Sequence, residues 1–238
     1  IQGVITSRVD RLPPGPRLVL KVASVIGRRF SLPLVQNIFP IVENQPAVPE
    51  YLELLMRVDI IDQHTLPETY VFKHVITQEV SYQLLPYSQR RQLHRALAEW
   101  LEQTYVLDLT PHYPLLAHHW GRTLGEQVDH TLAATTIGYM EKAGEVSLRE
   151  GAYDEALDHF ERALALVARM RSAEGDGESL PSYLSEARRA GWLLRMAEAY
   201  FGNGDSLRCR ALCHEALALL GEPFPHERPR MMSRLTKL

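Results

Sequence analysis

Several features that would point to a particular class of protein are scarce or missing in this sequence. Its 238 residues include only two cysteines, Cys209 and Cys213, which is too few for a disulfide framework and typical of a reducing compartment. No apolar run approaches the roughly 20 residues that a membrane-spanning helix needs. Residues 1–10 lack the charged and apolar blocks of a signal peptide. We therefore expect a cytoplasmic protein with no membrane partner.

A strong excess of either charge is also missing. The chain carries 26 Lys and Arg against 29 Asp and Glu, a net charge of -3, so no overall basic field indicates binding to nucleic acid. With 45% hydrophobic and 23% charged residues, the composition is that of an ordinary globular protein. The chain length predicts one large domain or two small ones.

The first hundred residues show helical periodicity that is interrupted by two β-type runs. Apolar residues recur at helical spacing in the stretches 4–12, 16–27, 32–39, 48–58, 74–85 and 88–104. Between them, residues 60–64 and 69–72 are typical of two short strands joined by a turn. We expect a mostly α fold that begins with a winged-helix-like domain and a small β-hairpin over residues 1–105. A linker with two prolines follows at 106–114.

The second half is helical throughout and repeats itself after a shift of 53 residues, the separation of Gly151 and Gly204. Small residues at matching positions let two antiparallel helices approach, and the glycines allow tight turns. The shift exceeds the tetratricopeptide period of about 34 residues, and we assign the excess to a loop at 171–181 and longer helix ends. The aligned positions are Gly144, Gly151, Tyr153, Ala156, Phe160 and Ala163 in the first window, and Ala197, Gly204, Ser206, Cys209, Cys213 and Ala216 in the second.

This alignment predicts tetratricopeptide-type repeats over residues 112–238, interrupted in a new helix at Leu238. Within each repeat we expect Gly144 to face Ala156, and Ala197 to face Cys209. Phe160 and Cys213 would then fill the space toward the next unit. Because each unit cannot bury its apolar face alone, the units stack.

Several short motifs occur in an order that resembles a known class of protein. They are ITSRVDRLP at 5–13, LKVASVIGRRF at 20–30, YVFKH at 70–74, QEVSY at 78–82 and QRRQLH at 89–94. This order resembles the region that follows the ATPase module in STAND-class signal-transduction ATPases. It is most similar to the bacterial regulators that carry adenylate or guanylate cyclase domains ahead of the ATPase and tetratricopeptide repeats behind it.

The resemblance implies a relay role without catalysis. The family binds ATP at a P-loop, but no G-x-x-x-x-G-K-[ST] motif occurs in this chain. We therefore expect no enzymatic activity and no cofactor in the chain, with ATP and ADP bound by a preceding domain. The winged helix would pack on the ATPase or cyclase module, and the repeats would bind an unknown protein partner. Because the chain does not begin with Met, we read it as a piece of a longer protein.

Two alternatives of other classes stay open. One is a segment of an ATP-dependent transcription regulator, whose DNA-binding domain is either the winged helix or lies outside this sequence. The other is a stand-alone repeat scaffold.

His74 is the one candidate for a cofactor contact, and it comes from the resemblance. It lies between a β-type run and the start of a helix. In STAND proteins a winged-helix histidine at a similar junction can contact the ADP phosphate and lock the resting state. The partial positive charge of a helix N-terminus would add to such a contact. The alternative is that His74 only caps the helix or fills a polar corner.

A basic patch on the helix over 88–104 raises the question of DNA binding. It consists of Arg90, Arg91, His94 and Arg95. Residues 1–103, however, contain 11 Lys and Arg against 10 Asp and Glu, a net charge of +1, and the candidate recognition helix over 32–39 has no Lys or Arg. We expect a solvated or interdomain face.

The sequence contains two groups of possible metal ligands, and we expect both to have structural roles instead. Cys209, Cys213 and His214 share one helix, but the cysteines fall on core positions of the repeat, so we expect buried thiols. The histidines at 112, 118 and 119 (His112, His118, His119) lack the spacing of a metal motif and are expected on a helix face. The sequence therefore predicts no metal site and no catalytic residue.

Overall fold

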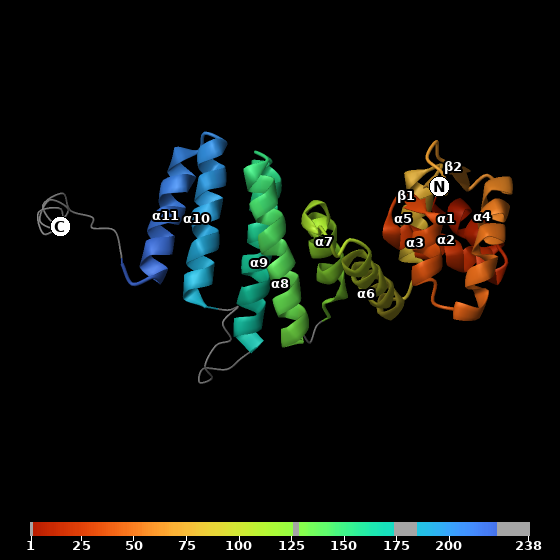
Figure 1. Ribbon diagram of the computed structural model, residues 1–238, viewed down its shortest axis with the longest axis horizontal. Helices are drawn as coiled ribbons and strands as arrows, with labels where there is room; N and C mark the ends of the chain where they lie inside the picture. Colours follow the sequence, from red (N-terminus) through yellow and green to blue (C-terminus); the bar gives the residue numbers. More distant parts are fainter. Residues whose placement is uncertain (1, 126–128, 174–184, 223–238) are drawn as a thin grey trace, which may run out of the picture. The chain divides into compact units, whose positions relative to one another are not determined.

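The computed structural model describes residues 2–125, 129–173 and 185–222 (Figure 1). Among these residues 76% are helical, in 11 α-helices and two short 3-10 helices, and a small three-stranded antiparallel sheet completes the regular structure. The prediction of a mostly α fold is confirmed. None of the described helices is both long and apolar enough to cross a bilayer. The chain divides into two compact units: Ile1–Leu109 with His118–Gly125, and Thr110–Ala117 with Glu126–Leu238.

The first unit is organised around α2. This helix packs against both α4 and α5, and Val19, Leu20 and Val22 on its apolar face are fully buried. It begins with a proline, whose missing N–H costs no helical hydrogen bond at that position, and it ends at Gly27. The helices of this unit are α1 (Gln2–Asp10), α2 (Pro14–Ile26), α3 (Leu32–Ile38), η1 (Val42–Ala47), α4 (Val48–Arg57), α5 (Val75–Gln83) and α6 (Tyr87–Thr104).

The sheet of the first unit has β3 (Thr69–Phe72) in the middle, paired antiparallel with β1 (Arg29–Ser31) on one side and β2 (Ile61–Gln63) on the other. Successive side chains of a strand point to opposite faces. Phe30 and Phe72 share the buried face, where their rings meet edge to face with centroids 5.5 Å apart. The predicted hairpin of β2 and β3 is confirmed, whereas β1 is a strand that the sequence did not predict.

The second unit consists mainly of two helical hairpins. The helices α8 (His130–Arg149) and α9 (Tyr153–Ala173) form the first, and α10 (Glu186–Gly202) and α11 (Ser206–Leu219) form the second. In Figure 1 these helices lie side by side, and α9 contacts α10. The short η2 (Thr110–His112) and the first part of α7 (Tyr113–Thr123) belong to this unit, while the last part of α7 belongs to the first unit.

Two predictions for this half extend beyond the described residues. The loop predicted at 171–181 starts later than expected, because α9 continues to Ala173. Its remainder, at 174–181, lies outside the described residues. So does the helix predicted to reach Leu238.

Both hairpins turn through the same backbone motif. Gly151 and Gly204 have φ values of +76° and +80°, which favour glycine because it lacks a Cβ atom. In each turn the following amide donates to a carbonyl five residues back: Ala152 to Ser147 and Asp205 to Tyr200, both at 2.8 Å. This is the Schellman pattern of helix ends. The predicted turn glycines are confirmed, and the two turns are related by the predicted shift of 53 residues.

A buried polar contact joins the two hairpins. One carboxylate oxygen of Glu141, in α8, accepts from the indole N–H of Trp192 at 2.9 Å, and the other accepts from Arg188 at 2.5 Å. Trp192 is only 2% exposed. The guanidinium of Arg188 also lies over the Trp192 ring, 5.4 Å from its centroid. Glu141 therefore accepts from an indole N–H of a residue on α10 that is almost completely buried.

We expect Glu141→Ala to lower the free energy of unfolding by about 1–3 kcal/mol, because it leaves the buried Trp192 N–H without an acceptor. Glu141→Gln should cost less, since the amide oxygen can still accept. Glu145→Ala, an exposed position on the same helix, should stay within about 0.5 kcal/mol. Urea unfolding of the three variants measures the differences. Equal costs at 141 and 145 would contradict the role of this contact.

Candidate functional site

His74 lies at the predicted junction, between the end of β3 and the start of α5. Its backbone is extended, with φ -125° and ψ 130°, and its carbonyl accepts from the Thr77 amide at 3.0 Å. The imidazole is exposed and makes no cap hydrogen bond to the helix. The side chain thus does not cap the helix, which was one of the two structural roles that the sequence left open.

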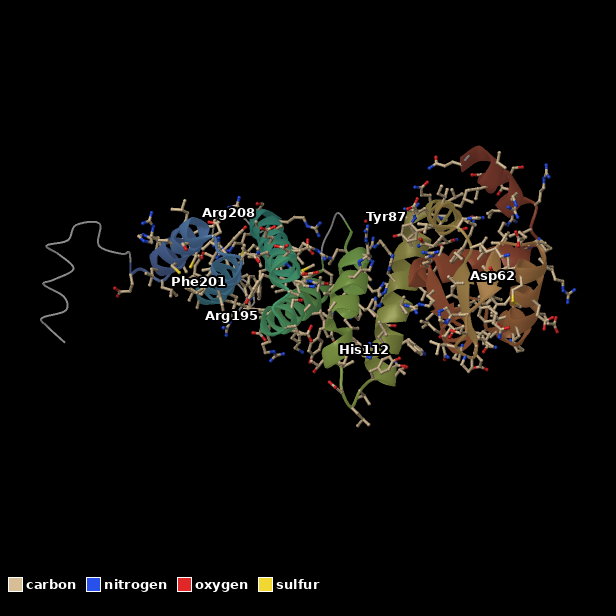
Figure 2. The ribbon with its side chains drawn as sticks, turned by 90° about the horizontal axis from the view of Figure 1, so that it is seen from above. Asp62, Tyr87, His112, Arg195, Phe201 and Arg208 are labelled. Atoms are coloured by element: carbon tan, nitrogen blue, oxygen red, sulfur yellow. The ribbon has the colours of Figure 1, made fainter. Side chains whose placement is uncertain are left out.

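An ionic network holds the strand end beside His74. The ammonium of Lys73 pairs with the carboxylates of Asp59 and of Asp62, and its distance to Asp62 is 3.2 Å. Figure 2 labels Asp62. Lys73 lowers the pKa of the Asp59 carboxyl, chiefly through their hydrogen bond, and the two carboxylates raise the pKa of Lys73. These contacts fix the backbone from which the His74 side chain extends.

Two apolar side chains are exposed on the first turn of α5, directly after His74. Val75 is 43% exposed and Ile76 is 40% exposed. The first N–H groups of an α-helix have no partner within the helix, and partial positive charge gathers there. We call His74, Val75 and Ile76 the α5 entry surface. Its chemistry suits contact with an anion and with an apolar protein surface at the same time.

The predicted close contact at Gly144 is present, but its partner differs from the expectation. A Cβ atom at position 144 would lie 2.8–3.0 Å from three ring atoms of Phe160. Phe160 itself is fully buried. Its ring packs on Gly144 within the same hairpin, and its atoms are the nearest to that position, where the alignment predicted Ala156.

Tyr153 makes a second contact between the hairpins. A Cβ atom on Gly202, at the end of α10, would collide with the Tyr153 ring. Beside it, the side-chain amide of Asn203 donates to the Asp154 carboxylate at 3.0 Å. The sequence alignment included Tyr153 but missed Gly202. The remaining small positions of the repeat are buried as predicted: Ala156, Ala163, Ala197 and Ala216.

Cys209 and Cys213 are only half-buried, so the prediction of buried core thiols is wrong. Among the described helices, α11 packs chiefly against α10, and the helix face that carries the cysteines is incompletely covered. Partial burial raises the pKa of Cys213, and the neighbouring Cys209 adds to this effect. The Cys213 thiol is thus protonated at neutral pH and a weak nucleophile.

Two arginines of the predicted basic patch bind backbone carbonyls, and the third, Arg95, pairs with the Glu99 carboxylate. Arg90 donates to the carbonyl of Leu85 at 2.9 Å, and Arg91 donates to that of Thr123 at 2.8 Å. His94 is not part of this surface, because it is only 2% exposed. The prediction of a solvated face is therefore wrong for His94, and the two guanidinium groups tie α6 to neighbouring segments.

His94 instead belongs to a histidine cluster that the sequence spacing did not predict. It lies in the middle of α6, and its partners His118 and His119 are consecutive in α7. Each residue offers a ring nitrogen, and all three nitrogens lie within 4.8 Å of one another. Both His118 and His119 lie on a helix as predicted, but His119 is only 3% exposed, whereas His118 is exposed. His112 is not a member of the cluster.

A hydrogen-bonded chain runs through this cluster. Nδ1 of His94 lies 2.8 Å from Nδ1 of His119, so one of the two rings donates and the other accepts. Nε2 of His94 lies 3.0 Å from the hydroxyl of Tyr82. Burial lowers the pKa of His94 and of His119 well below the usual value, and the charges of neighbours including His118 and Arg122 lower it further. Both rings are therefore neutral at pH 7.

No family model matches the chain, and neither a curated protein nor a solved structure matches it. The resemblance to STAND-class ATPases accordingly depends on the short motifs of the sequence.

Proposed function

We propose that the chain is a non-catalytic regulatory and protein-interaction segment of a multidomain, ATP-dependent signalling protein of the STAND class, linked to an adenylate cyclase. Its first unit acts as a winged-helix-like domain, and its second unit carries tetratricopeptide-type repeats. ATP and ADP bind mainly to a preceding module in the cytoplasm. The chain relays the state of that module to a protein partner.

The observation that carries this proposal is the exposed, uncapped imidazole of His74 at the start of α5. A histidine with no structural bond to the helix is available for a ligand, and the helix N-terminus beside it favours an anion such as a phosphate. Exposed Val75 and Ile76 on the same turn suit a protein surface that covers the anion. The imidazole of His74 thus fits the phosphate of a nucleotide, and Val75 and Ile76 fit the neighbouring domain that holds this nucleotide.

The second unit supports the interaction role. Its two hairpins share the turn motif at Gly151 and Gly204, which favours a repeated structural unit. Near the turn of the second hairpin, Phe201 and Leu207 are 69% and 73% exposed, and Figure 2 labels Phe201 on α10. Large exposed apolar side chains at one end of a helical hairpin suit a protein partner.

DNA binding is less well supported than protein binding. The helix α3 would be the recognition helix of a winged-helix domain, and its sequence LPLVQNI contains no Lys or Arg. Phosphate contacts by basic side chains supply most of the affinity of DNA-binding domains. A transcription regulator would therefore need its DNA-binding surface outside α3.

The chain alone is expected to show no ATP hydrolysis and no cyclase activity. It lacks the P-loop whose backbone amides and lysine hold the phosphates. Steady-state assays of the purified chain check this, with a repeat purification as the control for contaminating ATPases. Turnover that co-purifies with the chain at constant specific activity would contradict the proposal.

The relay role itself is tested in the longer protein that the proposal implies. ADP should leave the nucleotide module more slowly when this chain is attached than when it is removed. Equal release rates in the two proteins would contradict the relay role.

A further inference from the structure

The histidine cluster combines features that a purely structural hydrogen bond does not require. Three imidazoles from α6 and α7 converge, with ring centroids of His118 at 5.9 Å from His94 and 5.0 Å from His119. Two of the residues are almost completely buried, and the third, His118, is exposed. The cluster therefore has an interior pair of nitrogens and one ligand on the solvent side.

We propose that His94, His118 and His119 form a binding site for a transition-metal ion, with zinc as the best-fitting one. Three histidine nitrogens with an open fourth position are an established donor set for zinc, and imidazole also suits nickel and copper. The exposed side of His118 provides the path by which the ion enters. This site lies within the first unit and is independent of the function proposed for His74.

The distances are compatible with such an ion after a small movement. Zinc holds imidazole nitrogens at about 2.0–2.1 Å in a tetrahedron, which places two ligand nitrogens about 3.3 Å apart. The Nδ1 atoms of His94 and His119 lie 2.8 Å apart and already face each other. Metal bonds to both atoms require this separation to grow by about 0.5 Å, and the exposed His118 ring, whose nitrogen lies within 4.8 Å of the other two, has to adjust as well.

The protons can be accommodated without leaving the protein. In the hydrogen-bonded form one of the two Nδ1 atoms carries a proton. When the ion binds, that ring changes tautomer and its proton moves to Nε2, so that both Nδ1 lone pairs face the metal. For His94, Nε2–H then donates to the Tyr82 hydroxyl, which lies 3.0 Å away. Such a second hydrogen bond orients a metal-binding histidine and increases its basicity.

The surrounding charges bear on which species occupies the fourth position. The guanidinium groups of Arg122 and Arg90 lie near His94. The same positive charges oppose a divalent cation. They therefore favour an anion, such as hydroxide, as the fourth ligand, which lowers the net charge of the site.

The experiment measures zinc binding by the purified, tag-free chain in competition with a chelating dye at micromolar concentration. We expect one zinc ion per chain and a rise in the melting temperature on zinc addition, since a ligand that binds only the folded state stabilises it. His118→Gln is the main variant, because it removes one ligand nitrogen from the solvent side and retains His94 and His119. Tyr82→Phe tests the orienting hydrogen bond, and His130→Gln is the matched control on an exposed histidine of the second unit.

Tyr82→Phe should weaken zinc binding by about 10- to 100-fold. His118→Gln should weaken it at least as much, and His130→Gln should leave it unchanged. Absence of stoichiometric binding would overturn the proposal and leave His94 and His119 as a structural pair. Binding that survives His118→Gln but is lost in Cys209→Ser would also overturn it, because the ion would then be held by the cysteines of α11.

Discussion

Gly144→Leu is expected to destabilise the second unit by about 1–3 kcal/mol, the usual cost of overpacking a core. A Cβ atom at this position already lies 2.8 Å from the Phe160 ring, and the remaining leucine atoms need more space. Phe160 is fully buried and has no solvent-filled room to rotate into. The loss should appear as a lower midpoint in urea unfolding, with an unchanged slope.

The same helix contains a glycine at which a substitution is expected to raise the free energy of unfolding instead of lowering it. Gly138, two turns earlier in α8, has no atom within 4 Å of a Cβ built on it. Gly138→Ala should therefore stabilise the unit by up to about 1 kcal/mol, because alanine is the better helix former. Gly144→Ala should destabilise it, and the surface change Glu161→Gln should have little effect. Stabilisation by alanine at both glycines would show that Phe160 does not pack on Gly144.

His74→Ala is expected to accelerate ADP release from the longer protein by roughly ten- to a hundredfold. If the imidazole donates to a bound phosphate, that hydrogen bond to a charged group contributes about 1.5–3 kcal/mol, and each 1.4 kcal/mol is a factor of about ten. Basal output should rise with the release rate, because the resting arrangement is the one that retains ADP.

The structure adds a second readout to this experiment. Because His74 is exposed and makes no cap hydrogen bond, His74→Ala should change the free energy of unfolding by no more than about 0.5 kcal/mol. His74→Gln keeps a donor and should retain part of the slow release. Unchanged ADP release with a lowered melting temperature would identify His74 as an ordinary structural residue.

For the histidine cluster, the sequence pattern could indicate the burial of His94 but not its partner. His94 follows Leu93 and lies four residues before Ala98, both of which are buried, so its place within the apolar stripe of α6 was a signal of burial. The neighbouring arginines nevertheless led to the prediction that His94 lies on a solvated or interdomain face. Its pairing with His119, 25 residues further along the chain, is set by the contact of α7 with α6 and leaves no mark in local spacing.

The neighbour of Gly144 is a second feature that the sequence could not predict. The repeat alignment correctly indicated that a small residue is required there, because only glycine permits so close a contact. It did not indicate which side chain occupies the space. Ala156 and Phe160 are one turn apart on the same face of α9, and the choice between them depends on the relative position of the two helices.

What the sequence alone determined was local. Helical periodicity predicted most helices of the first unit, and glycines at 151 and 204 marked the hairpin turns because positive φ angles favour a residue without a Cβ atom. Tertiary structure decided the rest. The three residues of β1 are too few to show alternation, and they become a strand only by pairing with β3, about 40 residues away. In the same way, the half-exposure of Cys209 and the burial of His94 depend on what packs against each helix, which backbone preference does not specify.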